Sequence, residues 1–68
     1  MSNNQIKGII EEAFPGLAFR AKTEDGKEML VHLAGKLRIN RIRVVPGDSV
    51  IIETTPYDER RGRIIRRL

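Results

Sequence analysis

The sequence predicts an all-β fold in which five short strands close into one small barrel. Two observations indicate it: apolar and polar residues alternate in short runs, and clusters of turn-forming residues recur about every 8–12 residues. The length of 68 residues adds a third constraint, because a chain this short buries only about 60% of its unfolded surface. We therefore expect one domain, residues 1–68, with a thin hydrophobic core.

Each expected element is a run of residues with one pattern. The strands are expected over residues 6–12, 17–22, 28–33, 49–54 and 62–67, with a helical turn over 36–40. Pro, Gly and Asp mark the turns between them, over residues 14–16, 24–27, 46–48 and 55–58. The polar residues 1–5 precede the first strand and are expected to be flexible.

Alternation assigns the buried face of the first two strands. Ile6, Gly8 and Ile10 share one face of the first strand, and the glycine allows a neighbouring strand to approach closely. In the second strand Leu17, Phe19 and Ala21 alternate with Ala18, Arg20 and Lys22, which assigns Phe19 to the core.

The second half of the chain contains the helical turn and the last two strands. The segment 36–40 is too short to be a stable helix by itself, so a single turn is expected. Gly47 is expected to be a structural turn residue, and Val50, Ile52 and Ile64 are expected in the core. Five strands with a helical turn between the third and fourth are the layout of an OB barrel.

Charge is divided unevenly between the two halves of the chain. Residues 1–35 carry four cations and five acids, whereas residues 36–68 carry nine cations and four acids. A basic half on a small protein favours nucleic acid as the partner. A solvated basic surface that serves solubility is the simpler alternative, and a barrel that docks its basic face on an acidic protein is another.

Several classes of site are excluded by composition. There is no Cys and only one His, so disulfides, thiolate chemistry and a structural zinc site are not expected. His32 has no candidate catalytic partners, and the adjacent Glu11 and Glu12 are expected on opposite faces of a strand. The glycines are scattered singly, so no phosphate-binding loop is formed. We expect neither an enzyme nor a cofactor.

The candidate nucleic-acid contacts are cations and one tyrosine of the second half. Eight of the nine cations are Arg, whose planar fork pairs with phosphate in a way that solubility does not require. The cations are Lys36, Arg38, Arg41, Arg43, Arg60, Arg61, Arg63, Arg66 and Arg67. Tyr57 lies in the loop between the last two strands, which borders the binding face in OB barrels.

The aromatic residues indicate the mode of binding. Only Phe14, Phe19 and Tyr57 are aromatic, so the chain lacks the stacking platform of general single-strand binders. This favours a folded RNA surface that is recognised through phosphate, shape and a few inserted groups. Phe14, at the tip of the first loop, is either a wedge that enters an RNA groove or a side chain that closes the barrel end.

A set of motifs spread over the chain resembles a known family. The motifs are Gly8, Pro15, Phe19-Arg20, His32, Gly35-Lys36-Leu37-Arg38, Ile42-Arg43, Gly47-Asp48, Pro56-Tyr57-Asp58 and Gly62-Arg63-Ile64. In this order and spacing, from about Ile6 to Arg67, the chain resembles bacterial translation initiation factor one, an OB-fold protein of the 30S ribosomal subunit. It departs from the family at Arg41, where an aromatic residue is frequent.

The resemblance implies a function. It implies binding to the decoding region of 16S rRNA at the A site of the 30S subunit, next to a ribosomal protein, where the factor blocks premature tRNA entry. It also implies cooperation with the two larger initiation factors. The family's first loop enters an RNA minor groove, which corresponds here to Phe14, Pro15, Gly16 and Leu17.

The sequence also predicts the cellular location of the protein and leaves one alternative function open. No apolar run approaches membrane-spanning length and no signal peptide is recognisable, so we expect a cytoplasmic monomer without membrane contact. The alternative function is a generic OB-fold RNA-binding or RNA-chaperone module without ribosomal specificity.

Overall fold

The computed structural model describes residues 4–55 and 58–68. The elements are β1 (Asn4–Phe14), β2 (Ala18–Thr23), β3 (Glu28–Leu33), α1 (Gly35–Ile39), β4 (Ser49–Thr55) and β5 (Asp58–Arg67). The predicted OB barrel, with a short helix between the third and fourth strands, is confirmed.

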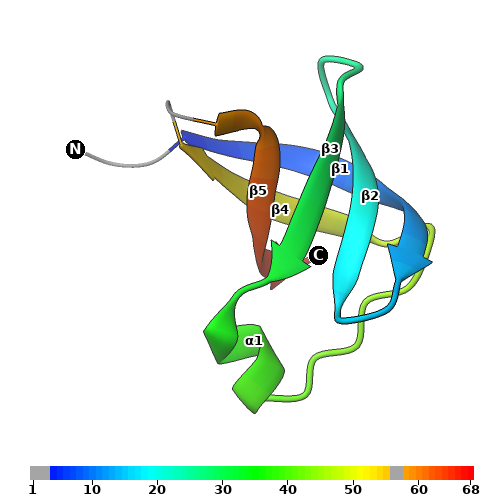
Figure 1. Ribbon diagram of the computed structural model, residues 1–68, viewed down its shortest axis with the longest axis vertical. Helices are drawn as coiled ribbons and strands as arrows, with labels where there is room; N and C mark the ends of the chain where they lie inside the picture. The colour runs from blue at the N-terminus through cyan, green and yellow to red at the C-terminus, as the bar shows by residue number, and fades with distance from the viewer. Residues whose placement is uncertain (1–3, 56–57) are drawn as a thin grey trace.

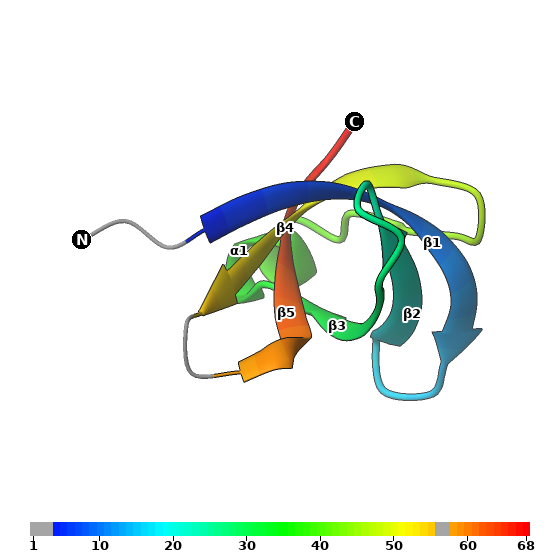
Figure 2. The same cartoon turned by 90° about the horizontal axis from the view of Figure 1, so that it is seen from above.

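The five strands form a closed barrel in the order β1-β2-β3-β5-β4. All neighbours are antiparallel except β3 and β5, which pair in parallel. The long β1 makes closure possible, because its first half pairs with β4 and its second half with β2. Figure 2 shows β1 curving over the barrel between these two partners. In Figure 1, α1 lies at one end of the barrel and the β2–β3 hairpin at the other.

The core lies inside the barrel, where the alternation predicted it. Val50, Ile52 and Ile64 are fully buried, and Ile10 and Phe19 are nearly so. The inner face of β1 continues through the buried Gly8 to the half-buried Ile6, which packs against the same cluster. The predicted core residues are therefore confirmed.

Two glycines allow the strands to close tightly around Ile52. A Cβ atom built on Gly8 would lie 2.8 Å from Cδ1 of Ile52, and one built on Gly62 would lie 2.5 Å from its Cγ2. Unbonded carbon atoms normally stay about 3.5–4.0 Å apart, so neither position has room for a side chain. The structural role predicted for Gly8 is confirmed. Gly47 has a φ of +96°, a turn conformation that suits glycine, and its predicted role is also confirmed.

Several element boundaries differ from those predicted, most clearly at the end of β1, the start of β2 and the start of β5. β1 continues to Phe14, because the chain turns at Pro15 and not before it, and Phe14 pairs with Ala18 of β2. Leu17 is not a strand residue, since it has a φ of +60° in the turn that precedes β2. β5 begins at Asp58 instead of residue 62, and its first residues carry no apolar alternation that would have revealed it.

The expectation for Glu11 and Glu12 was wrong. The register of β1 against β2 shifts between Ile10 and Glu12, which places an additional residue in β1. Such a bulge turns a side chain away from strict alternation. Both carboxylates consequently approach Arg20 on β2, at 3.7 Å from Glu11 and 3.1 Å from Glu12.

The N-terminal segment is described only in part. Of residues 1–5, the first three lie outside the described residues. Asn4 and Gln5 pair with Thr54 and Glu53 of β4.

Candidate nucleic-acid interface

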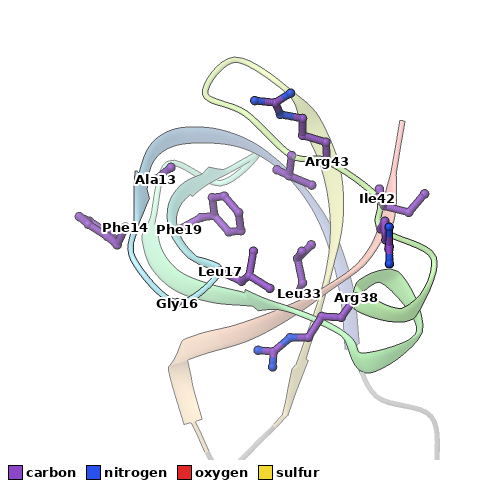
Figure 3. Close-up of a pocket in the computed structure, with 11 residues that line it drawn as sticks. Ala13, Phe14, Gly16, Leu17, Phe19, Leu33, Arg38, Ile42 and Arg43 are labelled. Carbon is purple, nitrogen blue, oxygen red and sulfur yellow. The ribbon is translucent and has the colours of Figure 1, made fainter.

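A groove of about 540 Å³ opens at the end of the barrel where α1 lies. We call it the barrel-end groove. Its apolar lining includes the buried Phe19, Leu33 and Val44 together with the more exposed Leu17 and Ile42. Figure 3 shows Phe19, Leu17 and Leu33 directed into this end of the barrel. The groove therefore has an apolar floor that is open to solvent.

Three arginines predicted as RNA contacts line the barrel-end groove: Arg38, Arg41 and Arg43. In Figure 3, Arg38 and Arg43 extend along opposite sides of the opening, with the apolar side chains between them. All three are exposed, and within residues 4–55 and 58–68 none of them forms an ion pair. Three like charges around one opening repel each other, which favours an anion bound between them.

The arginine-bearing segment between α1 and β4 is held in place by hydrogen bonds. Arg67 of β5 donates from Nη1 to the carbonyl oxygen of Arg43 at 2.7 Å. Asp48 accepts a hydrogen bond from the Val45 amide at 2.9 Å, and the Gly47 amide donates to the Ile10 carbonyl of β1 at 2.7 Å. The segment is irregular, but it is tied to both neighbouring strands. Arg67 therefore helps to fix the backbone that carries Arg43 at the groove.

The first loop forms the facing rim of the barrel-end groove. Gly16 and Leu17 line the groove, and the Leu33 amide of β3 donates to the Leu17 carbonyl at 3.4 Å. Pro15 precedes them and is exposed. Phe14 is half-buried and also lines the groove, and in Figure 3 its side chain points away from the barrel interior. The buried Phe19 and Leu33 lie at the same end of the barrel, and the role of Phe14 as a wedge stays a prediction.

The remaining predicted cations lie elsewhere on the surface. Lys36 is exposed on α1 outside the groove, and Arg60, Arg61, Arg63 and Arg66 are exposed along β5. Arg63 forms an ion pair with Glu53, its register partner on β4. This ion pair partly neutralises the charge that Arg63 presents to an anion. The structure thus groups Arg38, Arg41 and Arg43 but does not bring the β5 cations to the same groove.

Two further residues bear on the site. Tyr57 lies outside the described residues, so its predicted contact has no structural counterpart. His32, a residue of the family motif without a catalytic partner in the sequence, is exposed on β3 beside Arg63 in the parallel register with β5. The alternation of β3 could have placed it on the outer face.

The acidic residues Glu24 and Asp25 belong to the β2–β3 hairpin, at the end of the barrel opposite α1 (Figure 1). A hydrogen bond from the Thr23 hydroxyl lowers the pKa of the Asp25 carboxyl, and the Lys27 amide lowers it further. The Asp25 carboxylate therefore keeps its negative charge in mildly acidic solution. Glu24 and Asp25 therefore lie at the end of the barrel opposite the three groove arginines.

Other kinds of site are not formed by the described part of the chain. Over residues 4–55 and 58–68, no three His, Asp or Glu side chains gather where they would hold a metal ion. No helix within the same ranges has the length and apolar character to cross a membrane.

Comparison with known proteins places the chain among relatives. The family described as translation initiation factor 1A / IF-1 matches residues 1–68. The solution structure of translation initiation factor one from the Wolbachia endosymbiont strain TRS of Brugia malayi is 36% identical, with a TM-score of 0.81; the match covers 98% of this chain and 79% of that one. The crystal structure of YjeQ from Thermotoga maritima is 27% identical, with a TM-score of 0.74, over 96% of this chain and 23% of that one.

Proposed function

The chain belongs to the translation initiation factor 1A / IF-1 family, and from this membership we propose that it is a translation initiation factor of the 30S ribosomal subunit. It binds the decoding region of 16S rRNA at the A site and blocks premature entry of tRNA. Bound there, it contacts a neighbouring ribosomal protein and supports the two larger initiation factors.

The barrel-end groove is the observation that supports this proposal most directly. Its three arginines carry no ion pair within the described residues, and guanidinium groups bind backbone phosphates through charge-assisted hydrogen bonds. The turn formed by Pro15, Gly16 and Leu17 stands beside them and reaches into an RNA groove. Phosphate contact together with one inserted turn is suited to folded RNA, because it recognises shape more than base sequence.

The β5 cations extend the contact beyond the barrel-end groove. Arg60, Arg61, Arg63 and Arg66 meet flanking phosphates, and Glu53 shares the charge of Arg63. The whole chain acts as one RNA-binding domain and as a monomer. The role is binding without catalysis, in the cytoplasm where ribosomes initiate.

Co-sedimentation with purified subunits tests the proposal. The protein is expected to pellet with 30S subunits, to pellet much less with 50S subunits, and to be released as salt is raised between two concentrations. The salt dependence follows because each neutralised phosphate releases counterions. Equal binding to the two subunits would contradict the proposal.

Competition separates ribosomal binding from generic RNA binding. An excess of unstructured single-stranded RNA is expected to leave the 30S complex largely intact at the lower salt concentration. If this RNA displaced the protein as effectively as free 30S subunits do, the generic RNA-binding module would be the better description.

A further inference from the structure

Within residues 4–55 and 58–68, two residues other than glycine have a positive φ, and both line the barrel-end groove. Leu17 has a φ of +60° in the first loop, and Arg41 has a φ of +56° just after α1. A side chain makes this left-handed conformation unfavourable, and strained residues of this kind concentrate at functional sites. Arg41 is the more informative of the two, because its side chain is charged.

The backbone explains why position 41 must be left-handed. The Arg41 amide donates to the Arg38 carbonyl at 3.1 Å, and the Ile42 amide donates to the Leu37 carbonyl at 3.0 Å. These two bonds form the Schellman motif that ends many helices, in which the residue at position 41 is usually glycine. Leu37 and Ile42 pack against the core, which adds the apolar contact of that motif.

Within the described residues, no side-chain contact indicates that Arg41 contributes to folding. It is exposed, and within the described ranges it forms neither an ion pair nor a side-chain hydrogen bond. Glycine at this position would preserve both backbone bonds and would relieve the unfavourable conformation. The arginine is therefore unfavourable for folding, and its position beside Arg38 and Arg43 suggests what it serves.

Resting on the proposed function, we propose that Arg41 is a phosphate-binding residue at a position that folding alone would give to glycine. With Arg38 and Arg43 it forms a three-arginine site for RNA backbone phosphates at the mouth of the barrel-end groove. Three planar forks around one opening bind the oxygens of neighbouring phosphates, and the apolar floor excludes water from one side of these contacts.

The variant Arg41→Gly tests this inference because stability and binding are expected to move in opposite directions. The melting temperature, followed by circular dichroism, is expected to stay level or to rise by a few degrees. Affinity for 30S subunits is expected to fall roughly 10- to 100-fold, as the loss of one charge-assisted contact implies. The slope of log affinity against log salt is expected to become shallower by about one.

Two control variants separate charge from backbone effects. Leu17→Gly relieves the same kind of strain beside the same groove but removes no charge, so its salt slope is expected to match that of the wild type. Lys27→Ala removes a cation from the β2–β3 hairpin, at the opposite end of the barrel, and is expected to change neither the affinity nor the slope.

Each outcome decides between the two proposals. If the wild-type protein does not bind 30S subunits, the proposed function is wrong. If the wild type binds and Arg41→Gly binds with the same affinity and salt slope, the inference about Arg41 is overturned. A clear drop in the melting temperature of Arg41→Gly would overturn the helix-end argument on which the inference is built.

Discussion

Ile52 packs against Gly8 and Gly62 through two different side-chain atoms, so the effect of each contact on stability can be predicted separately. The close approach to Gly8 involves Cδ1 of Ile52, whereas the close approach to Gly62 involves Cγ2. Replacing Ile52 with Val removes Cδ1 and keeps Cγ2. We therefore expect Ile52→Val to rescue the variant Gly8→Ala and not the variant Gly62→Ala.

The magnitudes follow from the buried environment. Ile52 is fully buried, so its Cδ1 cannot move aside, and Gly8→Ala is expected to cost about 1–3 kcal/mol of the free energy of unfolding. Ile52→Val alone is expected to cost about 0.5–1.5 kcal/mol. Once Cδ1 is absent, the nearest atom to the new methyl group is the Lys22 carbonyl oxygen at 3.1 Å. The double variant should then be little less stable than Ile52→Val alone.

Gly62 provides the matched control. Its added methyl group would still meet Cγ2 of the valine, and it would also lie 3.2 Å from both the Glu53 carbonyl oxygen and Cε of Met29. The effects of Gly62→Ala and Ile52→Val are therefore expected to add within about 0.5 kcal/mol. The Gly8 pair should instead show a favourable coupling energy of about 1–3 kcal/mol.

Urea and thermal unfolding, followed by circular dichroism, measure all five variants against the wild type. In a domain of this size, 1 kcal/mol shifts the melting temperature by roughly 4–8 °C, so the coupling is readily resolved. Additive effects of Gly8→Ala and Ile52→Val would refute the reasoning. Equal rescue of both glycine variants would refute it too, because a general loosening of the core would then explain the result.

The other predictions concern charge. Replacing Arg38 and Arg43 together with glutamine is expected to weaken 30S binding by about one to three orders of magnitude, while the melting temperature stays within a few degrees of the wild type. Lys27→Gln is the control and is expected to change neither quantity. Normal co-sedimentation of the double variant with 30S subunits would contradict the assignment of these arginines to the RNA-binding site. Because the pKa of Asp25 is lowered by folding, its stabilising effect is present above the unfolded value of about 3.9 and is lost as pH falls through the folded value. Asp25→Asn should therefore melt below the wild type at neutral pH and approach it as the pH falls through the folded value; a constant difference would show that the carboxylate charge does not contribute to stability.

The sequence predicted the parts of the fold that alternation determines. Val50, Ile52 and Ile64 lie in β-branched runs of period two, so their burial follows from the pleat of a strand. The start of β5 could not be predicted in the same way, because its first residues are charged and show no apolar alternation. The bulge that brings Glu11 to Arg20 could not be predicted either, because one additional residue in a strand is not recognisable in the apolar and polar pattern of the sequence.

The cations were visible in the sequence, but their grouping was not. Arg38 and Arg43 meet the first loop only because the barrel closes, which brings the end of β1 and the segment after α1 to one opening. The ion pair between Arg63 and Glu53 likewise depends on the register of β4 against β5. Charge density along the chain therefore favours a nucleic-acid partner, and the barrel geometry determines which charges lie together.

The irregular segment after α1 is better suited than a strand to concentrating charge. Successive side chains of a strand point to opposite faces, so consecutive cations of β5 cannot all face one opening, and Arg63 pairs with Glu53. The left-handed turn at Arg41 breaks that alternation and brings Arg38, Arg41 and Arg43 to one groove. Such a segment has no strand ladder to hold it, so the hydrogen bond from Arg67 to the Arg43 carbonyl takes over part of that role. Under the proposed function, the C-terminal end of β5 thus contributes to RNA binding by fixing a backbone whose own arginines make the contacts.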